Sequence, residues 1–177
     1  MKTPEEWAAL NIVTETNLPH EMPYIAWVLR YRVASPRFPN TMKEVVLQKR
    51  QFSAWNPWTH GKFKGKFPQE EIWHEMWKTL DQTTREKLYP VALMCATFII
   101  GGTGPSSLAE AKVGTMTTVY APAPSWQAPF GPEVCWYYSP ISMIPAGTAP
   151  SWAVKARRTF TPSGIDPARF VFCERVE

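Results

Sequence analysis

Two glutamates, Glu15 and Glu21, flank the segment TNLPH and carry the side chains best suited to acid–base chemistry. Residues 4–15 have helical spacing, so Glu15 is expected at the carboxyl end of a helix, where the negative end of the dipole raises a carboxyl pKa slightly. Such an acid can protonate a glycosidic oxygen, and one carboxylate suffices when a hydroxyl of the substrate is the nucleophile. Glu21 is expected in the first turn of the next helix, where the dipole lowers the pKa. The residues alone therefore single out Glu15 as a candidate general acid.

Other reaction chemistries lack the residues that they need. His74 precedes Glu75, but the zincin pattern requires a second histidine at the position of Lys78. The chain has no Gly-x-Ser-x-Gly elbow, and GGTGPSS follows a predicted helix rather than a strand, which disfavours a serine nucleophile and a phosphate loop. The cysteines show no Cys-x-x-Cys spacing. We therefore expect no metal site and no cofactor.

The segment KRQFSAWNPWTHGKFKGKFP, residues 49–68, interleaves basic and aromatic side chains between glycine and proline breaks. Single-strand nucleic-acid binders use such segments, and the same side chains can grip a glycan. Packing within a solvated loop explains them equally well. One loop of this kind does not predict a nucleic-acid partner.

Length and composition fit one globular domain. The chain has 177 residues, 45% of them hydrophobic and 19% charged, with a net charge of +4 and a pI near 9.0. Its longest apolar run, YPVALMCATFII, is too short to span a bilayer. The first residues, MKTPEEWAAL, are acidic where an export signal would be basic, so no cleavable signal is expected.

The elements that must position these residues are mainly helical. Helices are expected over residues 4–15, 21–35, 42–48, 68–80 and 84–100, with capping pairs Thr3–Glu6, Thr41–Glu44 and Thr83–Glu86. Short strands are expected in TMTTVYAP, VCWYYSP and RFVFCERV. The predicted fold class is therefore α+β and mainly helical. One domain is expected over residues 1–177, helical over 1–100 and built of strands and loops over 101–177.

Several segments resemble a known family. They are Arg32-Val33, Ser35-Pro36-Arg37-Phe38-Pro39-Asn40-Thr41 and Gln51-Phe52-Ser53, followed near the carboxyl end by YYSPISM, PSWA and SGIDPARFVF. Together they resemble the SleB-type cell-wall hydrolases, which include spore cortex-lytic enzymes and many phage lysins. In that family a helix ending in a Glu-Ala-Arg-Gly-Glu-like motif precedes an Asn-Arg-Val-like segment, a proline-rich turn and a Gln-Phe-Ser motif. The likeness covers most of the chain and is faint over residues 57–132.

The resemblance implies a lysozyme-like fold of the lytic transglycosylase type that cleaves peptidoglycan between N-acetylmuramic acid and N-acetylglucosamine. The family's catalytic glutamate ends the first helix, and Glu15 stands in that place here. By family chemistry it would protonate the glycosidic oxygen and then accept a proton from the muramoyl C6 hydroxyl, leaving a 1,6-anhydro end. Completion by water instead stays open.

Two departures from the family pattern bear on the site. The Ala-Arg-Gly-Glu continuation is replaced by Thr16-Asn17-Leu18-Pro19-His20-Glu21 with a shorter spacing to the next helix, which keeps Glu21 open as the acid. The family's Thr-His before its tyrosine motif is Cys135-Trp136 here, so any role of that histidine is absent or filled differently.

The substrate-binding residues expected by this resemblance are Gln51, Ser53, Trp55, Trp58, Tyr137 and Tyr138. Gln51 and Ser53 would form hydrogen bonds to the substrate. Tyr137 and Tyr138 would stack or present hydroxyls near the acid. Trp55 and Trp58 are candidates for a sugar platform, with packing as the alternative interpretation.

The resulting prediction is a phage-borne enzyme, either an endolysin or a wall-piercing virion component. Its substrate would be peptidoglycan glycan strands, with other virion proteins as partners in the second case. It would be made in the host bacterial cytoplasm without a signal peptide, insert stably into no membrane and act in the cell wall or periplasm. The alternative is a non-catalytic phage structural or peptidoglycan-binding protein that retains the fold.

Overall fold

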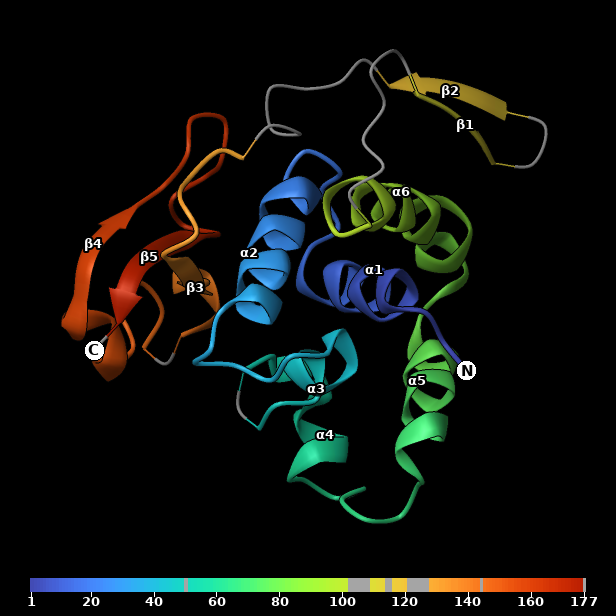
Figure 1. The fold of residues 1–177 in the computed structure, drawn as a ribbon, viewed down its shortest axis with the longest axis horizontal. Helices are drawn as coiled ribbons and strands as arrows, with labels where there is room; N and C mark the ends of the chain where they lie inside the picture. Colours follow the sequence, from blue (N-terminus) through green and yellow to red (C-terminus); the bar gives the residue numbers. More distant parts are fainter. Residues whose placement is uncertain (50, 102–108, 114–115, 121–127, 144, 177) are drawn as a thin grey trace. The chain divides into compact units, whose positions relative to one another are not determined.

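The computed structural model describes residues 1–49, 51–101, 109–113, 116–120, 128–143 and 145–176 (Figure 1). Its contacts divide the chain into two compact units, Met1–Gln127 and Ala128–Glu177. We call these the helical unit and the strand unit. Helices dominate the first and a small antiparallel sheet the second, which confirms the predicted mainly helical α+β class. The expectation of one peptidoglycan-cleaving domain over residues 1–177 stays a prediction.

The helical unit follows the predicted order of helices. Its elements are α1 (Pro4–Glu15), α2 (Met22–Ala34), α3 (Met42–Val46), the 3-10 turn η1 (Ser53–Trp55), α4 (Asn56–Thr59), α5 (Gln69–Thr79), the π-helical segment η2 (Thr84–Leu88), α6 (Tyr89–Ile99), and the antiparallel strands β1 (Ala109–Val113) and β2 (Met116–Tyr120). The basic and aromatic segment thus contains two short helical turns where the sequence predicted only a loop. Residues 115, 121 and 122 of the predicted TMTTVYAP strand lie outside the described residues.

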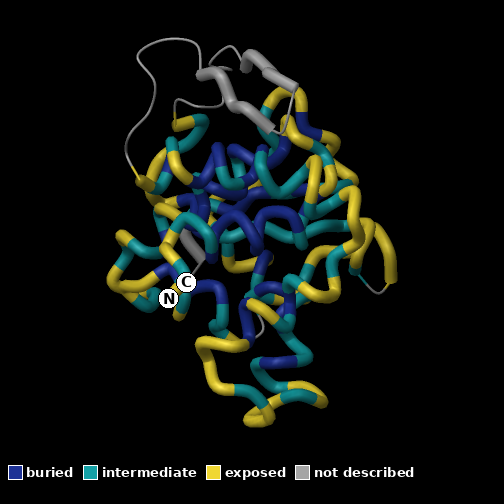
Figure 2. The backbone as a smooth tube through the Cα atoms, turned by 90° about the vertical axis from the view of Figure 1, so that its right-hand side faces the viewer, coloured by how far each residue is buried: buried dark blue, intermediate teal, exposed yellow. Residues whose placement is uncertain are grey.

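Helix α1 is the centre of this unit. Thr3 and Glu6 form the predicted capping box, because the Thr3 hydroxyl accepts from the Glu6 N–H and the Glu6 carboxylate accepts from the Thr3 N–H. Residues 7–13 are all buried, so the helix is covered on every side rather than on one face (Figure 2). Its main partner is α6, with α3 and α2 also packed against it. A helix buried all round holds its carboxyl end firmly.

The start of the helix before α6 differs from the prediction. Thr83 makes no side-chain cap; instead the Asp81 carboxylate accepts from the Thr84 N–H at 2.8 Å and from the Thr84 hydroxyl at 2.7 Å. Aspartate caps well because its carboxylate can accept from a helix's first N–H groups. The chain then passes through η2 before Pro90, whose ring cannot donate an N–H and crowds the preceding turn.

The strand unit is a three-stranded antiparallel sheet in the order β3-β5-β4. Its strands are β3 (Val134–Tyr138), β4 (Ala156–Phe160) and β5 (Val171–Val176), with short 3-10 turns η4 (Pro140–Ser142) and η5 (Ser151–Lys155) between β3 and β4. The sequence analysis missed β4, because ARRTF reads as a charged segment. It is an edge strand with Arg157 and Arg158 exposed, and charges are common on such edges.

Aromatic rings form the core of the strand unit around Phe172 on the central strand. Phe172 is almost fully buried and lies 5.3 Å from Phe130, 5.9 Å from Tyr137 and 6.3 Å from Phe160 between ring centroids. Such ring pairs stabilise a core beyond the area that they bury. The rings thus add a packed core to the hydrogen-bonded pairing of the three strands.

No helix among the residues that the structure describes combines the length and apolar character needed to cross a membrane.

Candidate active site

The turn between α1 and α2 is closely hydrogen-bonded. The Thr16 N–H donates to the Ile12 carbonyl at 3.0 Å and closes α1. The Glu21 N–H donates to the Leu18 carbonyl at 3.0 Å, and the Met22 N–H to the Pro19 carbonyl at 3.3 Å. Few backbone groups in this turn are left to move independently, so the two glutamates at its ends have defined positions.

Glu15 is the last residue of α1, as the sequence predicted. Its side chain is half-buried, with the Oε1 atom shielded from solvent. A carboxyl group that is partly desolvated yet keeps some exposed surface can meet a substrate and exchange a proton with it. The catalytic role of Glu15 stays a prediction.

Glu21 has a different environment at the other end of the turn. Its side chain is only 1% exposed, and its Oε2 accepts a hydrogen bond from the Thr16 hydroxyl. The same hydroxyl accepts from the Leu18 N–H at 3.0 Å. Thr16 itself is buried. Glu21 therefore stabilises the turn through a buried hydrogen bond to Thr16, and little of its surface is available to a substrate.

Asn11 is a buried polar residue that the sequence analysis missed. It lies one turn before Glu15 on α1, and residues four apart share a helix face. The Trp55 indole N–H donates to its Oδ1 at 2.9 Å, whereas its Nδ2 has no hydrogen-bond partner among the described residues. The only sequence signal is one asparagine within the apolar stretch AALNIV. Asn11 thus connects α1 to η1, the turn that begins at the last residue of the Gln-Phe-Ser motif.

The two tryptophans expected as a sugar platform are buried. Trp55 is 1% exposed and packs against Trp7 with ring centroids 5.7 Å apart, and Trp58 is 8% exposed beside Phe63. A stacking platform must offer a ring face to solvent, so this burial disfavours that role. The alternative interpretation, packing, fits both residues.

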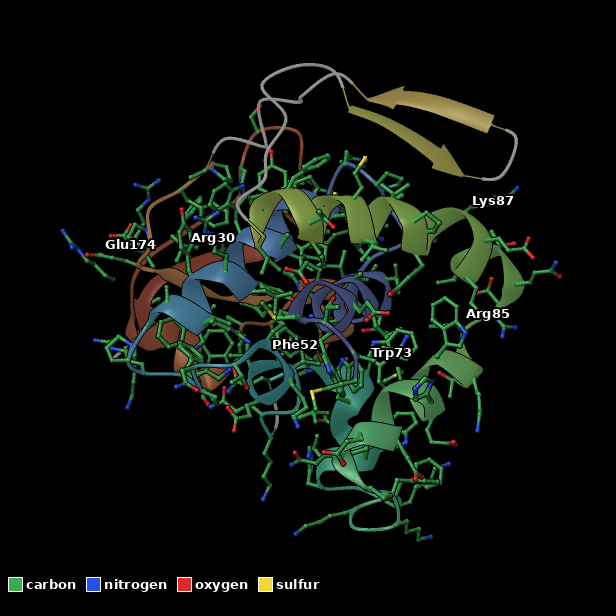
Figure 3. The ribbon with its side chains drawn as sticks, turned by 45° about the vertical axis from the view of Figure 1, so that its right-hand side comes forward. Arg30, Phe52, Trp73, Arg85, Lys87 and Glu174 are labelled. Atoms are coloured by element: carbon green, nitrogen blue, oxygen red, sulfur yellow. The ribbon has the colours of Figure 1, made fainter. Side chains whose placement is uncertain are left out.

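The three segments of the helical unit that carry the family resemblance, residues 32–33, 35–41 and 51–53, meet at Arg32. Its guanidinium is buried and lies 4.8 Å from the Phe52 ring centroid and 5.1 Å from that of Phe38 (Figure 3 labels Phe52). A guanidinium between aromatic faces gains cation–π stabilisation when it is desolvated. On either side of Phe52, Gln51 is half-buried and Ser53 is exposed. The cluster fixes the loop that presents the two predicted hydrogen-bonding residues.

Tyr137 and Tyr138 belong to the strand unit. The Tyr137 ring lies 5.4 Å from Phe170, and the Tyr138 ring lies 6.0 Å from Trp152 between centroids. Burial, together with nearby Cys173, raises the pKa of Tyr138, so its hydroxyl is protonated at neutral pH. Both side chains are half-buried. Their predicted place near the acid stays a prediction.

The described residues offer little for other chemistries. No group of three or more histidine, cysteine or acidic side chains among them is arranged to hold a metal ion. The three cysteines are buried and form no disulfide among the described residues; burial raises the pKa of Cys95 to about 12 and that of Cys173 to about 11. A thiol with such a pKa is not a nucleophile at neutral pH.

Comparison with known protein families gives a match. The family model described as Cell Wall Hydrolase matches residues 19–115, more than half of the chain. The matched part contains Glu21 and the Arg32 cluster and begins four residues after Glu15. No curated protein and no solved structure matches significantly.

Proposed function

Because the chain belongs to the cell wall hydrolase family, whose members degrade peptidoglycan, we propose that it cleaves the bond between N-acetylmuramic acid and N-acetylglucosamine with Glu15 as its single general acid and base. The observation that carries this proposal is the difference in solvent exposure between Glu15 and Glu21, which lie at the two ends of one turn. Glu15 keeps exposed surface at the end of a buried helix, while Glu21 is sealed inside against Thr16. Only the first carboxyl can reach a glycosidic oxygen without unfolding the turn.

In the proposed reaction the Glu15 carboxyl protonates the glycosidic oxygen as the bond to the muramoyl C1 breaks. The carboxylate then takes the proton of the muramoyl C6 hydroxyl, whose oxygen bonds to C1 and gives a 1,6-anhydro product. Gln51 and Ser53 are proposed to hydrogen-bond the glycan, and Tyr137 and Tyr138 to line it. The helical unit would then be a lysozyme-like lobe, in a phage enzyme that acts as an endolysin or within the virion.

The test is mass spectrometry of purified peptidoglycan digested with the wild type, Glu15→Gln and Glu21→Gln. We expect 1,6-anhydro muropeptides from the wild type and a rate about 10²- to 10⁴-fold lower for Glu15→Gln, the usual contribution of a general acid. Glu21→Gln keeps an oxygen that can accept from Thr16 and should retain most of the activity.

Each other result has a defined meaning. Reducing ends from the wild type would show that water, not the C6 hydroxyl, is the nucleophile. Glu15 would still be the proposed acid. Loss of activity in Glu21→Gln with an unchanged unfolding midpoint, while Glu15→Gln stays active, would transfer the role of acid to Glu21.

A non-catalytic phage structural or peptidoglycan-binding protein is the second candidate. It is favoured by the start of the family match at residue 19, which leaves the proposed acid outside the matched part. This reading predicts that the wild type binds peptidoglycan without releasing any product, and that Glu15→Gln binds equally well.

A further inference from the structure

The loop between α4 and α5 exposes three lysines in five residues. Lys62, Lys64 and Lys66 are all exposed within residues 61–67, which we call the lysine loop. In Figure 1 this loop lies at the end of the helical unit opposite α6, and Figure 2 colours most of it as exposed. The lysine loop is therefore a basic surface at this end of the helical unit.

No ion pair with a described residue compensates the positive charge of this loop. The sequence contains no acidic residue between Glu44 and Glu70, and Glu70 lies 3.8 Å from Lys43. None of the three lysines forms an ion pair with a described residue. By contrast, Lys2 and Lys78 each have a carboxylate within 2.8 Å. An uncompensated cluster of this kind attracts anions from solution.

The base of the lysine loop is firmly built. The Gly61 N–H donates to the Asn56 carbonyl and the Phe63 N–H to the Pro57 carbonyl, both at 2.8 Å. A side chain at Gly61 would place a Cβ 2.8 Å from the Pro57 Cα, closer than real contacts allow. A fixed base lowers the entropy that a partner must remove on binding.

Aromatic rings support this base and are not free to stack. The Phe63 ring lies 5.4 Å from Trp58, and the Lys62 and Lys66 ammonium groups lie 4.6 and 5.9 Å from its centroid. Trp58 is buried. Sugars and single-stranded bases both need an open ring face, so this arrangement favours a partner recognised by charge alone.

We propose that the lysine loop docks the chain onto the free carboxylates of peptidoglycan stem peptides. This rests on the proposed substrate, which repeats such carboxylates along every glycan strand. Three ammonium groups on alternate residues can contact several carboxylates at once, so weak single contacts add up to retention on the polymer. The loop would keep the enzyme on the wall between cleavage events.

The experiment compares sedimentation of the chain with purified sacculi stripped of anionic accessory polymers. The test variant is Lys62→Gln/Lys64→Gln/Lys66→Gln, and the control, Lys78→Gln/Lys87→Gln/Lys155→Gln, removes the same charge from exposed lysines elsewhere. We expect about tenfold weaker binding for the test variant, from three exposed ion pairs, and wild-type binding for the control. Raising salt from about 50 to about 300 mM should weaken the wild type much more than the test variant, because screening acts on the lysines.

A second arm uses sacculi whose carboxyl groups have been converted to amides. The wild type should bind these as weakly as the test variant binds native sacculi. Equal binding of the wild type and the test variant to native sacculi would overturn the proposal, as would wild-type binding that survives amidation. Tighter binding to a single-stranded DNA oligomer than to sacculi, lost in the test variant, would assign the loop to nucleic acid instead.

The outcome is independent of whether the proposed reaction occurs. Sedimentation requires no cleavage, and released products are measured in the same samples. A wild type that releases nothing but loses binding in the test variant would refute the proposed function and keep the docking surface. If the wild type releases anhydro products and the test variant binds sacculi as well as the control variant does, the proposed function is kept and the docking surface is refuted.

Discussion

The helical unit and the strand unit differ in what they bury. The buried polar and charged side chains among the described residues are Asn11, Thr16, Glu21 and Arg32, all in the helical unit. The buried residues of the strand unit are apolar, such as Val134, Ile165 and Phe172, or thiols. Burying polar groups costs free energy unless they are hydrogen-bonded, so a fold retains them where position matters more than stability. Buried polar contacts therefore fix the positions of side chains in the helical unit, two of them in the turn after Glu15. The sheet is filled by apolar packing instead.

The largest expected effect tests the strand unit. Phe172→Ala removes the ring at the centre of the aromatic core and should lower the free energy of unfolding by about 3–5 kcal/mol. Phe172→Leu, which keeps most of the volume, should lower it by about 1 kcal/mol. Urea unfolding followed by tryptophan fluorescence measures both. Similar losses for the two variants would show that something other than packing holds the sheet.

A smaller loss is expected inside the helical unit at Glu21. Glu21→Ala leaves the buried Thr16 hydroxyl without this acceptor and opens a void, which should lower the free energy of unfolding by about 1–3 kcal/mol. Glu21→Gln retains an acceptor oxygen and should lose less than half as much. The same urea titration checks this. If the amide variant were as unstable as the alanine variant, the negative charge rather than the hydrogen bond would hold the turn.

Two tryptophans that are close in sequence provide a matched pair. Trp55→Phe removes the indole N–H that donates to Asn11 and should lower the free energy of unfolding by about 1–2 kcal/mol. The Trp58 indole N–H has no hydrogen-bond partner among the described residues, so Trp58→Phe should cost less. Thermal unfolding monitored by circular dichroism ranks the two. Equal losses would mean that ring volume, not the Asn11 bond, sets the stability here.

The smallest effect concerns the surface of the helical unit. Hydrogen bonds from Thr84 lower the pKa of exposed Asp81, so the cap stabilises the fold above the ordinary aspartate range and is lost as the pH falls through the lowered value. The wild type should therefore exceed Asp81→Asn in unfolding midpoint at pH 7, and the gap should close in strong acid. If the difference in unfolding midpoint did not change with pH, the stabilisation by this cap would not depend on the charge of Asp81.

The sequence predicted those features that depend on neighbouring residues. The Thr3–Glu6 cap, the end of α1 at Glu15 and the order of helices all follow from local propensity and spacing. It leaves open the features that a distant partner decides. Trp55 is buried and donates a hydrogen bond to Asn11, 44 residues earlier, and no local pattern reveals that contact.

Two misses near predicted elements have simpler causes. Asp81 and Thr83 are both good capping residues, and only the backbone path selects between them. Strand β4 has the charged sequence of an exposed edge, which weakens the alternation that marks a strand.

The central position of α1 has a consequence for how the protein is made. This helix is synthesised before α6, which covers it most extensively and begins about 70 residues later. At about 5–20 residues per second, a ribosome needs about 4 to 15 seconds to supply that partner. Throughout this interval α1 lacks its most extensive native contact, the one with α6. The segment that ends in Glu15 is thus incompletely covered until α6 is made, and exposed apolar surface of this kind makes a nascent chain prone to aggregation.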